Sequence, residues 1–280
     1  MKFCIVGTGR CGTRLLRAML IKHPDLYVFN ETHWIPELYN RFGTLPVPVS
    51  ALLDVVARTV HVNGDLVAEF DHQEFLTSAN HPQDMTVVEF CNAVGAFFAR
   101  QHGNSIWADK TPDYGYFSST LQVYWPDCKI IHLIRDGAAV VNSMSRHIGY
   151  KALVAARQFT WCPLSLDYAG CPDGYPPQPV QAFAELWYRR LVRTRDEAAR
   201  LQPGTYLEVR HEDILRAPVA ELRRIAKFTD LRAADDWLAN SATLIDAGRT
   251  RKARPIEVLR DFTAEQVRLL QNLGYAVSPE

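Results

Sequence analysis

The chain has 280 residues, of which 48% are hydrophobic, and its 31 basic and 31 acidic residues give a formal net charge of zero. This length supports a large buried core, and the balanced charge excludes a general attraction to nucleic acid or anionic lipid. No secretory signal, run long enough to span a membrane or CxxC pair is recognisable, so we expect a cytoplasmic protein with free thiols, although Cys162 and Cys171 could pair.

Taken in chain order, the pattern alternates strands and helices. The apolar run Phe3-Cys4-Ile5-Val6 enters a glycine-rich turn, and apolar residues then recur at helical spacing until His23-Pro24. Residues 35–105 are mostly helical in pattern. The expected strands are 2–7, 27–29, 105–110, 128–136 and, with a turn, 205–214, and the expected helices are 13–22, 138–147, 183–200, 218–230 and 263–273.

This alternation predicts an α/β fold with a mostly parallel central sheet flanked by helices on both faces. No internal repeat or low-complexity tract divides the chain, so we expect a single domain over 1–280. Residues 160–181 are rich in proline, glycine and aromatic residues, which predicts an irregular loop or lid.

The turn after the first strand has the composition of a phosphate-binding loop. Successive N–H groups at a helix N-terminus bind anions, and glycines allow a ligand to approach the backbone. Gly7 and Gly12 have the spacing of GxxxxGK[ST], but Thr13-Arg14 follows where a nucleoside-triphosphate enzyme needs lysine and a hydroxyl residue. A plain tight turn, or the GxGxxG turn of a dinucleotide oxidoreductase completed by Gly9 and Gly12, are the alternatives.

A second phosphate-binding pattern follows the strand 128–136. Arg135 stands at the carboxyl end of that strand and Ser143 lies two turns into the next helix. Ligands of open α/β sheets bind at that edge, so an arginine and a helix hydroxyl there fit a second phosphate. The alternative is a structural ion pair of Arg135 with Asp136 or Asp109.

Two charged residues at strand ends are candidates for chemistry. Glu31 follows a short strand and could accept a proton from an acceptor hydroxyl, with His33 as the second choice of base. The alternative is a helix start capped by Asn30 or Thr32, with Glu31 in its first turn. Lys110 ends another strand, before Thr-Pro, and could point into a cleft rather than form a surface pair.

Several motifs together resemble the sulfotransferases that use 3′-phosphoadenosine-5′-phosphosulfate (PAPS). These are "GTGRCGTRLLRAMLIKHPDL", "IIHLIRDGAAVVNSMSRH", "NETHWIPEL", "WADKTPDYGYF" and "LEVRHEDILRAP", and they are most similar to soluble, bacterial-type relatives of the tyrosylprotein enzymes. The resemblance implies a P-loop-like three-layer fold. It also implies that the first loop holds the 5′-phosphosulfate and the second motif the 3′-phosphate, and that no metal is needed.

The resemblance implies Glu31 as the general base and Lys110 as a cation near the sulfuryl group and leaving phosphate. His33 stands where tyrosylprotein enzymes carry arginine, so the acceptor stays open: a small molecule, sugar, lipid or peptide tyrosine. The oligomeric state is not readable. Arg10 joins the catalytic set, and the expected donor-binding residues are Gly9, Arg10, Cys11, Gly12, Thr13, Arg14, Arg135, Ser143 and, in a basic C-terminal loop at 249–254, Arg249, Arg251 and Lys252.

Two rival functions remain at this point. A magnesium-dependent P-loop kinase would use Asp136 as its metal-holding carboxylate, but the Thr13-Arg14 pair argues against it. A non-catalytic nucleotide-binding protein could have the same fold, and the presence of both Glu31 and Lys110 argues against that reading.

Overall fold

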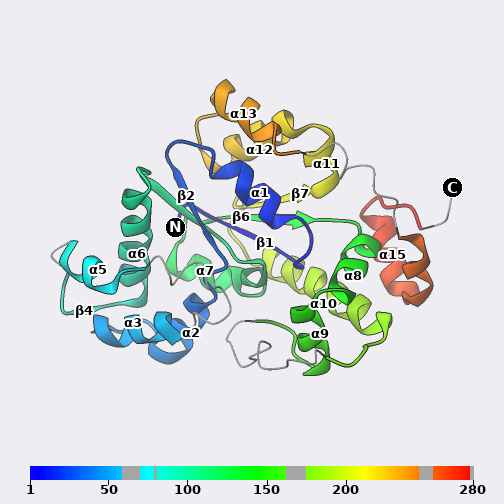
Figure 1. The fold of residues 1–280 in the computed structure, drawn as a ribbon, viewed down its shortest axis with the longest axis horizontal. Coiled ribbons are helices and arrows are strands. Elements are labelled where there is room, and N and C mark those ends of the chain that lie inside the picture. The colour runs from blue at the N-terminus through cyan, green and yellow to red at the C-terminus, as the bar shows by residue number, and fades with distance from the viewer. Residues whose placement is uncertain (59–69, 79–80, 162–174, 246–254, 278–280) are drawn as a thin grey trace.

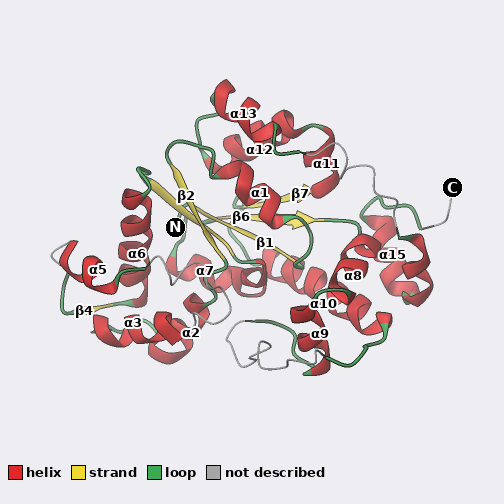
Figure 2. Cartoon of the chain, viewed as in Figure 1, coloured by secondary structure: helices red, strands yellow, loops and turns green. Residues whose placement is uncertain are grey.

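The computed structural model describes residues 1–58, 70–78, 81–161, 175–245 and 255–277. At its centre lies a sheet of five parallel strands in the order β2-β5-β1-β6-β7 (Figure 2). The strands are β1 (Phe3–Gly7), β2 (Leu26–Asn30), β5 (Ile106–Lys110), β6 (Lys129–Ile134) and β7 (Tyr206–Arg210).

The sheet is covered on both faces, which explains its continuous apolar runs. Along β1, Phe3 and Ile5 pack into one hydrophobic cluster, whereas Cys4 and Val6 pack into the other. Helices on the two faces lie on opposite sides of the sheet (Figure 1). One face carries α1 (Thr13–Leu20), α12 (Pro218–Thr229) and α13 (Asp235–Ala242), and the other carries α6 (Val87–Gln101) and α7 (Ser118–Tyr124).

The remaining elements surround these layers. A short antiparallel pair, β3 (Val47–Pro48) with β4 (Asp84–Met85), lies beyond α6. The other helices are α2 (Trp34–Phe42), α3 (Val49–Arg58), α5 (His72–Ser78), α8 (Gly137–Ser145), α9 (Ile148–Ala155), α10 (Val180–Ala198), α11 (His211–Arg216) and α15 (Ala264–Asn272), with 3₁₀ turns η2 (Pro112–Phe117) and η3 (Ile256–Asp261). None of the helices in the described ranges is long and apolar enough to cross a bilayer.

The predicted three-layer α/β fold with a parallel central sheet is confirmed. The expected helix 138–147 instead ends at Ser145, because the His147 side chain caps a new helix, α9. The predicted loop 160–181 is too long at its end, since α10 starts at Val180. Most of that loop, including Cys162 and Cys171, and the basic cluster at 249–254 lie outside the described residues.

The strand register brings the chain's candidate residues to one edge. Gly7 is level with Leu133, and Asn30 is level with Lys110 on the neighbouring strand. Because parallel strands end at the same edge, the loop after β1 and the residues after β2, β5 and β6 meet there.

Candidate functional site

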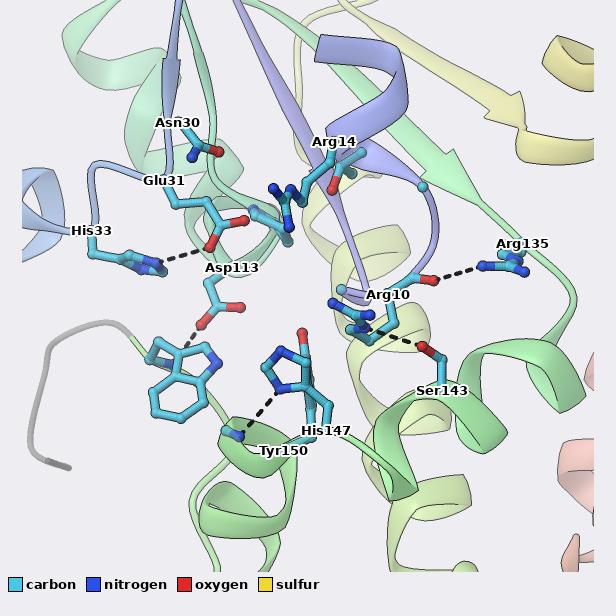
Figure 3. A pocket seen from close by; sticks show the side chains of 16 residues that line it. Arg10, Arg14, Asn30, Glu31, His33, Asp113, Arg135, Ser143, His147 and Tyr150 are labelled. Carbon is cyan, nitrogen blue, oxygen red and sulfur yellow. Dashed lines mark hydrogen bonds and ion pairs between the residues drawn. The ribbon is translucent and has the colours of Figure 1, made fainter. Parts of the chain in front are cut away.

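A cavity of about 450 Å³ opens at the carboxyl edge of the sheet. Figure 3 shows side chains from the loop after β1, the β2–α2 connection, η2, α8 and α9 facing it. Its lining residues are Gly9, Arg10, Gly12, Thr13, Arg14, Asn30, Glu31, His33, Pro112, Asp113, Arg135, Ser143, His147, Gly149, Tyr150 and Trp161. Nine of these sixteen are site residues that the sequence predicts: Gly9, Arg10, Gly12, Thr13, Arg14, Glu31, His33, Arg135 and Ser143.

The loop after β1 has the backbone of an anion-binding nest. Gly9, Arg10 and Gly12 all have positive φ, at 77°, 54° and 101°. Helix α1 then begins at Thr13, so its first N–H groups, which have no partner within the helix, lie beside the cavity. This geometry favours a bound anion such as a phosphate over the plain-turn alternative.

Glycine at position 9 is required by close packing as well as by its positive φ. A Cβ on Gly9 would lie 1.6 Å from the hydroxyl oxygen of Tyr150 and 2.8 Å from its Cζ. Gly9→Ala should therefore lower the free energy of unfolding by about 2–4 kcal/mol, from overpacking and left-handed backbone strain together. Urea unfolding would measure this. The double variant with Tyr150→Phe should recover part of the loss, since the hydroxyl makes the worst clash, and no recovery would contradict this explanation.

The two phosphate-binding patterns of the sequence are in direct contact. The Arg10 Nε donates a hydrogen bond to the Ser143 hydroxyl at 3.1 Å, and Arg135 Nη1 donates to the Arg10 carbonyl at 3.2 Å. Both contacts are drawn in Figure 3. Arg10, Arg14 and Arg135 thus give the cavity three cationic side chains around the nest.

Glu31 and Lys110 come together from neighbouring strand ends. The Lys110 ammonium, fully buried, forms an ion pair with the Glu31 carboxylate, and Glu31 N–H donates to the Lys110 carbonyl at 2.8 Å. Burial acts to raise the pKa of Glu31, but Lys110 and His33 outweigh it and hold that pKa well below its usual range. Burial also lowers the pKa of Lys110, against the opposing effect of Glu31.

The helix-cap alternative for this segment is wrong. Helix α2 starts at Trp34, and its N-cap is His33, whose side chain makes no capping bond. The His33 ring is buried and its Nε2 lies 3.6 Å from the second Glu31 oxygen. Glu31 therefore faces the cavity beside His33 (Figure 3), with Lys110 as its ion-pair partner, which suits a carboxylate that exchanges protons.

Four cavity residues with notable chemistry were missed from the sequence: Asp113, His147, Tyr150 and Trp161. His147 Nδ1 accepts a hydrogen bond from the Gly149 N–H at 3.2 Å, and burial together with Arg10 lowers its pKa. Asp113 accepts hydrogen bonds from the Trp161 N–H and the Thr160 hydroxyl. The only available signal was position: Asp113 directly follows the Thr-Pro that ends β5, and His147 lies two residues after the end of α8.

Arg190 of α10 connects three segments that contribute residues to the cavity lining. The guanidinium is fully buried, donates to the Thr8 carbonyl at 3.1 Å and to the Phe159 carbonyl at 2.6 Å, and lies 3.3 Å from an Asp113 oxygen. The loop after β1, the 159–161 segment and η2 are therefore tied to one side chain.

Cys11 and Lys110 are expected site residues that do not line the cavity. The Cys11 side chain is buried beneath the loop, and burial raises its pKa, so only its backbone could bind a ligand. Lys110 does not line the cavity and reaches it through Glu31. Arg249, Arg251 and Lys252 lie outside the described residues. Within the described ranges, no three histidine, cysteine or carboxylate side chains gather as a metal-ligand group.

The chain is similar in sequence to two named relatives. The chain is 25% identical over 237 residues to a candidate protein-tyrosine sulfotransferase of Caenorhabditis briggsae, and 24% identical over 232 residues to protein-tyrosine sulfotransferase A of Caenorhabditis elegans. These alignments cover 83% and 81% of this chain but only 66% and 49% of the two relatives.

Two solved structures share the fold over nearly the whole chain. The sulfotransferase domain from the curacin biosynthetic pathway matches with a TM-score of 0.58 at 17% identity, covering 99% of this chain and 98% of that one. The sulfotransferase domain from the Synechococcus PCC 7002 olefin synthase matches with a TM-score of 0.55 at 20% identity, covering 99% and 95%. A model of the sulfotransferase family matches residues 3–236, from the first strand into α13, and the chain therefore belongs to the sulfotransferase family.

Proposed function

We propose that this sulfotransferase moves a sulfuryl group from PAPS to a hydroxyl-bearing acceptor, with Glu31 as general base. The observation that carries the proposal is that Glu31, paired with the buried Lys110, lines the same cavity as an anion-binding loop. A base, a buried cation and an anion site at one sheet edge are the parts that group transfer between two oxygens requires.

The donor would lie along the cationic side of the cavity. The N–H groups from Cys11 to Arg14, with the Thr13 hydroxyl, would bind the 5′-phosphosulfate. Arg135 and Ser143, on the β6–α8 side, would bind the 3′-phosphate that distinguishes this donor from ATP. A donor held by backbone amides and arginines needs neither a P-loop lysine nor a metal ion.

Different residues of the chain would serve different steps of an in-line transfer. Glu31 accepts the acceptor's proton while the acceptor oxygen bonds to sulfur and the bond between sulfur and the 5′-phosphate oxygen breaks. Arg10 and Lys110 stabilise the negative charge that develops on the departing phosphate, leaving adenosine 3′,5′-bisphosphate (PAP). Preorganised positive charge beside the reacting groups is the largest expected contribution to the rate.

The ion pair between Lys110 and Glu31 makes the base dependent on the donor. The ion pair with Lys110 lowers the pKa of Glu31, so Glu31 is a weak base while the pair is formed. An anionic sulfuryl group in the cavity competes for Lys110, which raises the basicity of Glu31 where it is needed. We therefore propose that donor binding precedes proton transfer.

The acceptor side of the cavity is formed by His33, Asp113, Tyr150 and Trp161. Two relatives carry names that assign them to protein tyrosine, so a phenolic hydroxyl is the first acceptor to test. The test incubates the full chain with ³⁵S-labelled PAPS and EDTA, with 4-nitrophenol, a tyrosine peptide, a sugar and a lipid alcohol in turn. Transfer of label to at least one acceptor is expected, and no transfer to any, with ATP turnover in magnesium, would contradict the proposal.

Arg135→Ala should weaken PAP binding by roughly 10–100-fold, the effect of losing a hydrogen bond between charged groups. Binding of 5′-AMP, which lacks the 3′-phosphate, should be unchanged. Arg146→Ala is a matched control, since Arg146 is an exposed arginine at the end of α8 that does not line the cavity. Calorimetric titration measures all three, and an equal loss of AMP and PAP affinity would remove Arg135 from the 3′-phosphate site.

A further inference from the structure

The connection between β2 and α2 is short and strained. Glu31 and His33 have φ values of 64° and 52°, in the left-handed region that residues other than glycine rarely adopt. Such conformations persist only where surrounding contacts enforce them, and they concentrate at functional sites. Both side chains are turned toward the cavity, where they face each other (Figure 3). Thr32, between them, does not line the cavity.

Thr32 is held by three side chains in the protein interior. Its hydroxyl donates to Asp109 Oδ2 at 2.9 Å and lies 2.6 Å from the Tyr114 hydroxyl, and its N–H donates to the Thr111 hydroxyl at 2.9 Å. Thr32 is 4% exposed, and Asp109, Thr111 and Tyr114 are fully buried. The hydroxyl and the N–H of Thr32 are thus fixed from β5 and the turn after it, while its carbonyl accepts from the Trp34 N–H at 2.6 Å.

Asp109 and Lys110, the last two residues of β5, bind different residues of this connection. Lys110 pairs with Glu31, whereas the Asp109 carboxylate binds Thr32 and also accepts from the Cys4 thiol at 3.9 Å. Successive strand residues point to opposite faces of a sheet, which explains how adjacent positions reach both. A buried carboxylate costs free energy unless it is hydrogen-bonded, and the Thr32 hydroxyl supplies one of the hydrogen bonds that Asp109 needs.

We propose that Thr32, anchored by Asp109, is a positioning residue that holds Glu31 in the conformation in which it serves as base. The inference rests on the proposed function of Glu31. A misplacement of about 1 Å in a catalytic group is enough to cost on the order of 100-fold in rate. Loss of the Thr32 hydroxyl frees the connection to relax to negative φ, which turns Glu31 away from the acceptor without touching the donor site.

The test compares Thr32→Val with Thr32→Ser, which differ in whether the anchoring hydroxyl is kept. With ³⁵S-labelled PAPS and 4-nitrophenol, Thr32→Val should lower kcat by roughly 10–100-fold while PAP affinity and the KM for PAPS stay within about twofold. Thr32→Ser should retain most of the activity. Thr229→Val is the control, because Thr229 is equally buried but its hydroxyl bonds only its own helix, α12. Equal kcat in Thr32→Val and wild type would overturn the inference.

A second readout does not depend on the acceptor. In crystal structures with PAP, Glu31 should keep positive φ in Thr32→Ser and lose it in Thr32→Val, and retention in both would overturn the inference. If Thr32→Val fails to fold, Tyr114→Phe is the substitute, because it removes one partner of the Thr32 hydroxyl. Tyr114→Phe should give a smaller fall in kcat with PAP affinity unchanged. An unaltered kcat in Tyr114→Phe would overturn the inference. If the wild-type protein binds no PAP, or Glu31→Gln is fully active, it is the proposed function that fails, not the anchoring of Thr32.

Discussion

Replacing Glu31 by glutamine should lower turnover by roughly 10²–10⁴-fold, the usual effect of losing a positioned base. Glutamine has nearly the same shape but does not accept a proton at neutral pH. The replacement also releases Lys110 from its ion pair, so the affinity for PAP should not fall. Steady-state rates with PAPS and 4-nitrophenol, together with calorimetry of PAP, measure the two effects separately.

Two further variants make this result specific. Glu37→Gln is the matched control, since Glu37 lies on α2 and pairs with Arg41 at the surface, and its turnover should be unchanged. His33→Gln distinguishes the second choice of base, because His33 lies 3.6 Å from Glu31. Near-normal turnover in Glu31→Gln with a large loss in His33→Gln would transfer the role of base to His33.

Replacing Arg190 by methionine should lower the free energy of unfolding by about 3–5 kcal/mol, the effect of breaking a buried ion pair from one side. The Asp113 carboxylate would lose its buried charge partner, and the Thr8 and Phe159 carbonyls would each lose a donor. Because these groups belong to three segments that contribute residues to the cavity lining, PAP affinity should fall as well. Urea unfolding and calorimetry are the measurements.

Neighbouring substitutions separate this effect from general damage to α10. Arg189→Met should change stability by less than about 1 kcal/mol, since the Arg189 side chain is 62% exposed and its ion pair with Glu185 is at the surface. Adding Asp113→Asn to Arg190→Met should recover part of the loss by removing the unpaired charge. A change below about 1 kcal/mol in Arg190→Met would mean that water or a rearranged side chain replaces the guanidinium.

The sheet was predictable because its strands are short apolar runs bounded by turn residues. β1 and β6 are buried on both faces, so each appears in the sequence as a continuous apolar run that can be recognised without knowledge of distant contacts. The small elements were not predictable in this way. The β3–β4 pair has two residues in each strand, and α9 depends on a cap by the His147 side chain rather than on apolar spacing. Their formation is decided by tertiary contacts.

The cavity was predictable where a residue directly follows a strand. Glu31 directly follows β2 and Lys110 ends the neighbouring strand β5, so the parallel register alone brings the two residues together. Arg190 was missed because "WYRRLVR" offers three arginines, and only the helical spacing of Trp187, Arg190 and Thr194 indicates which one is buried. The anchoring of Thr32 was beyond prediction, since it needs the positive φ of its two neighbours and a carboxylate 77 residues away.

The most direct test of the account is calorimetric titration of the full chain with PAP, 5′-AMP and ATP in EDTA. PAP should bind at least roughly tenfold tighter than either of the others, because only PAP offers a 3′-phosphate to Arg135 and Ser143. Equal binding of PAP and 5′-AMP, or tighter binding of ATP, would contradict it, since the cavity would then hold no site for a 3′-phosphate.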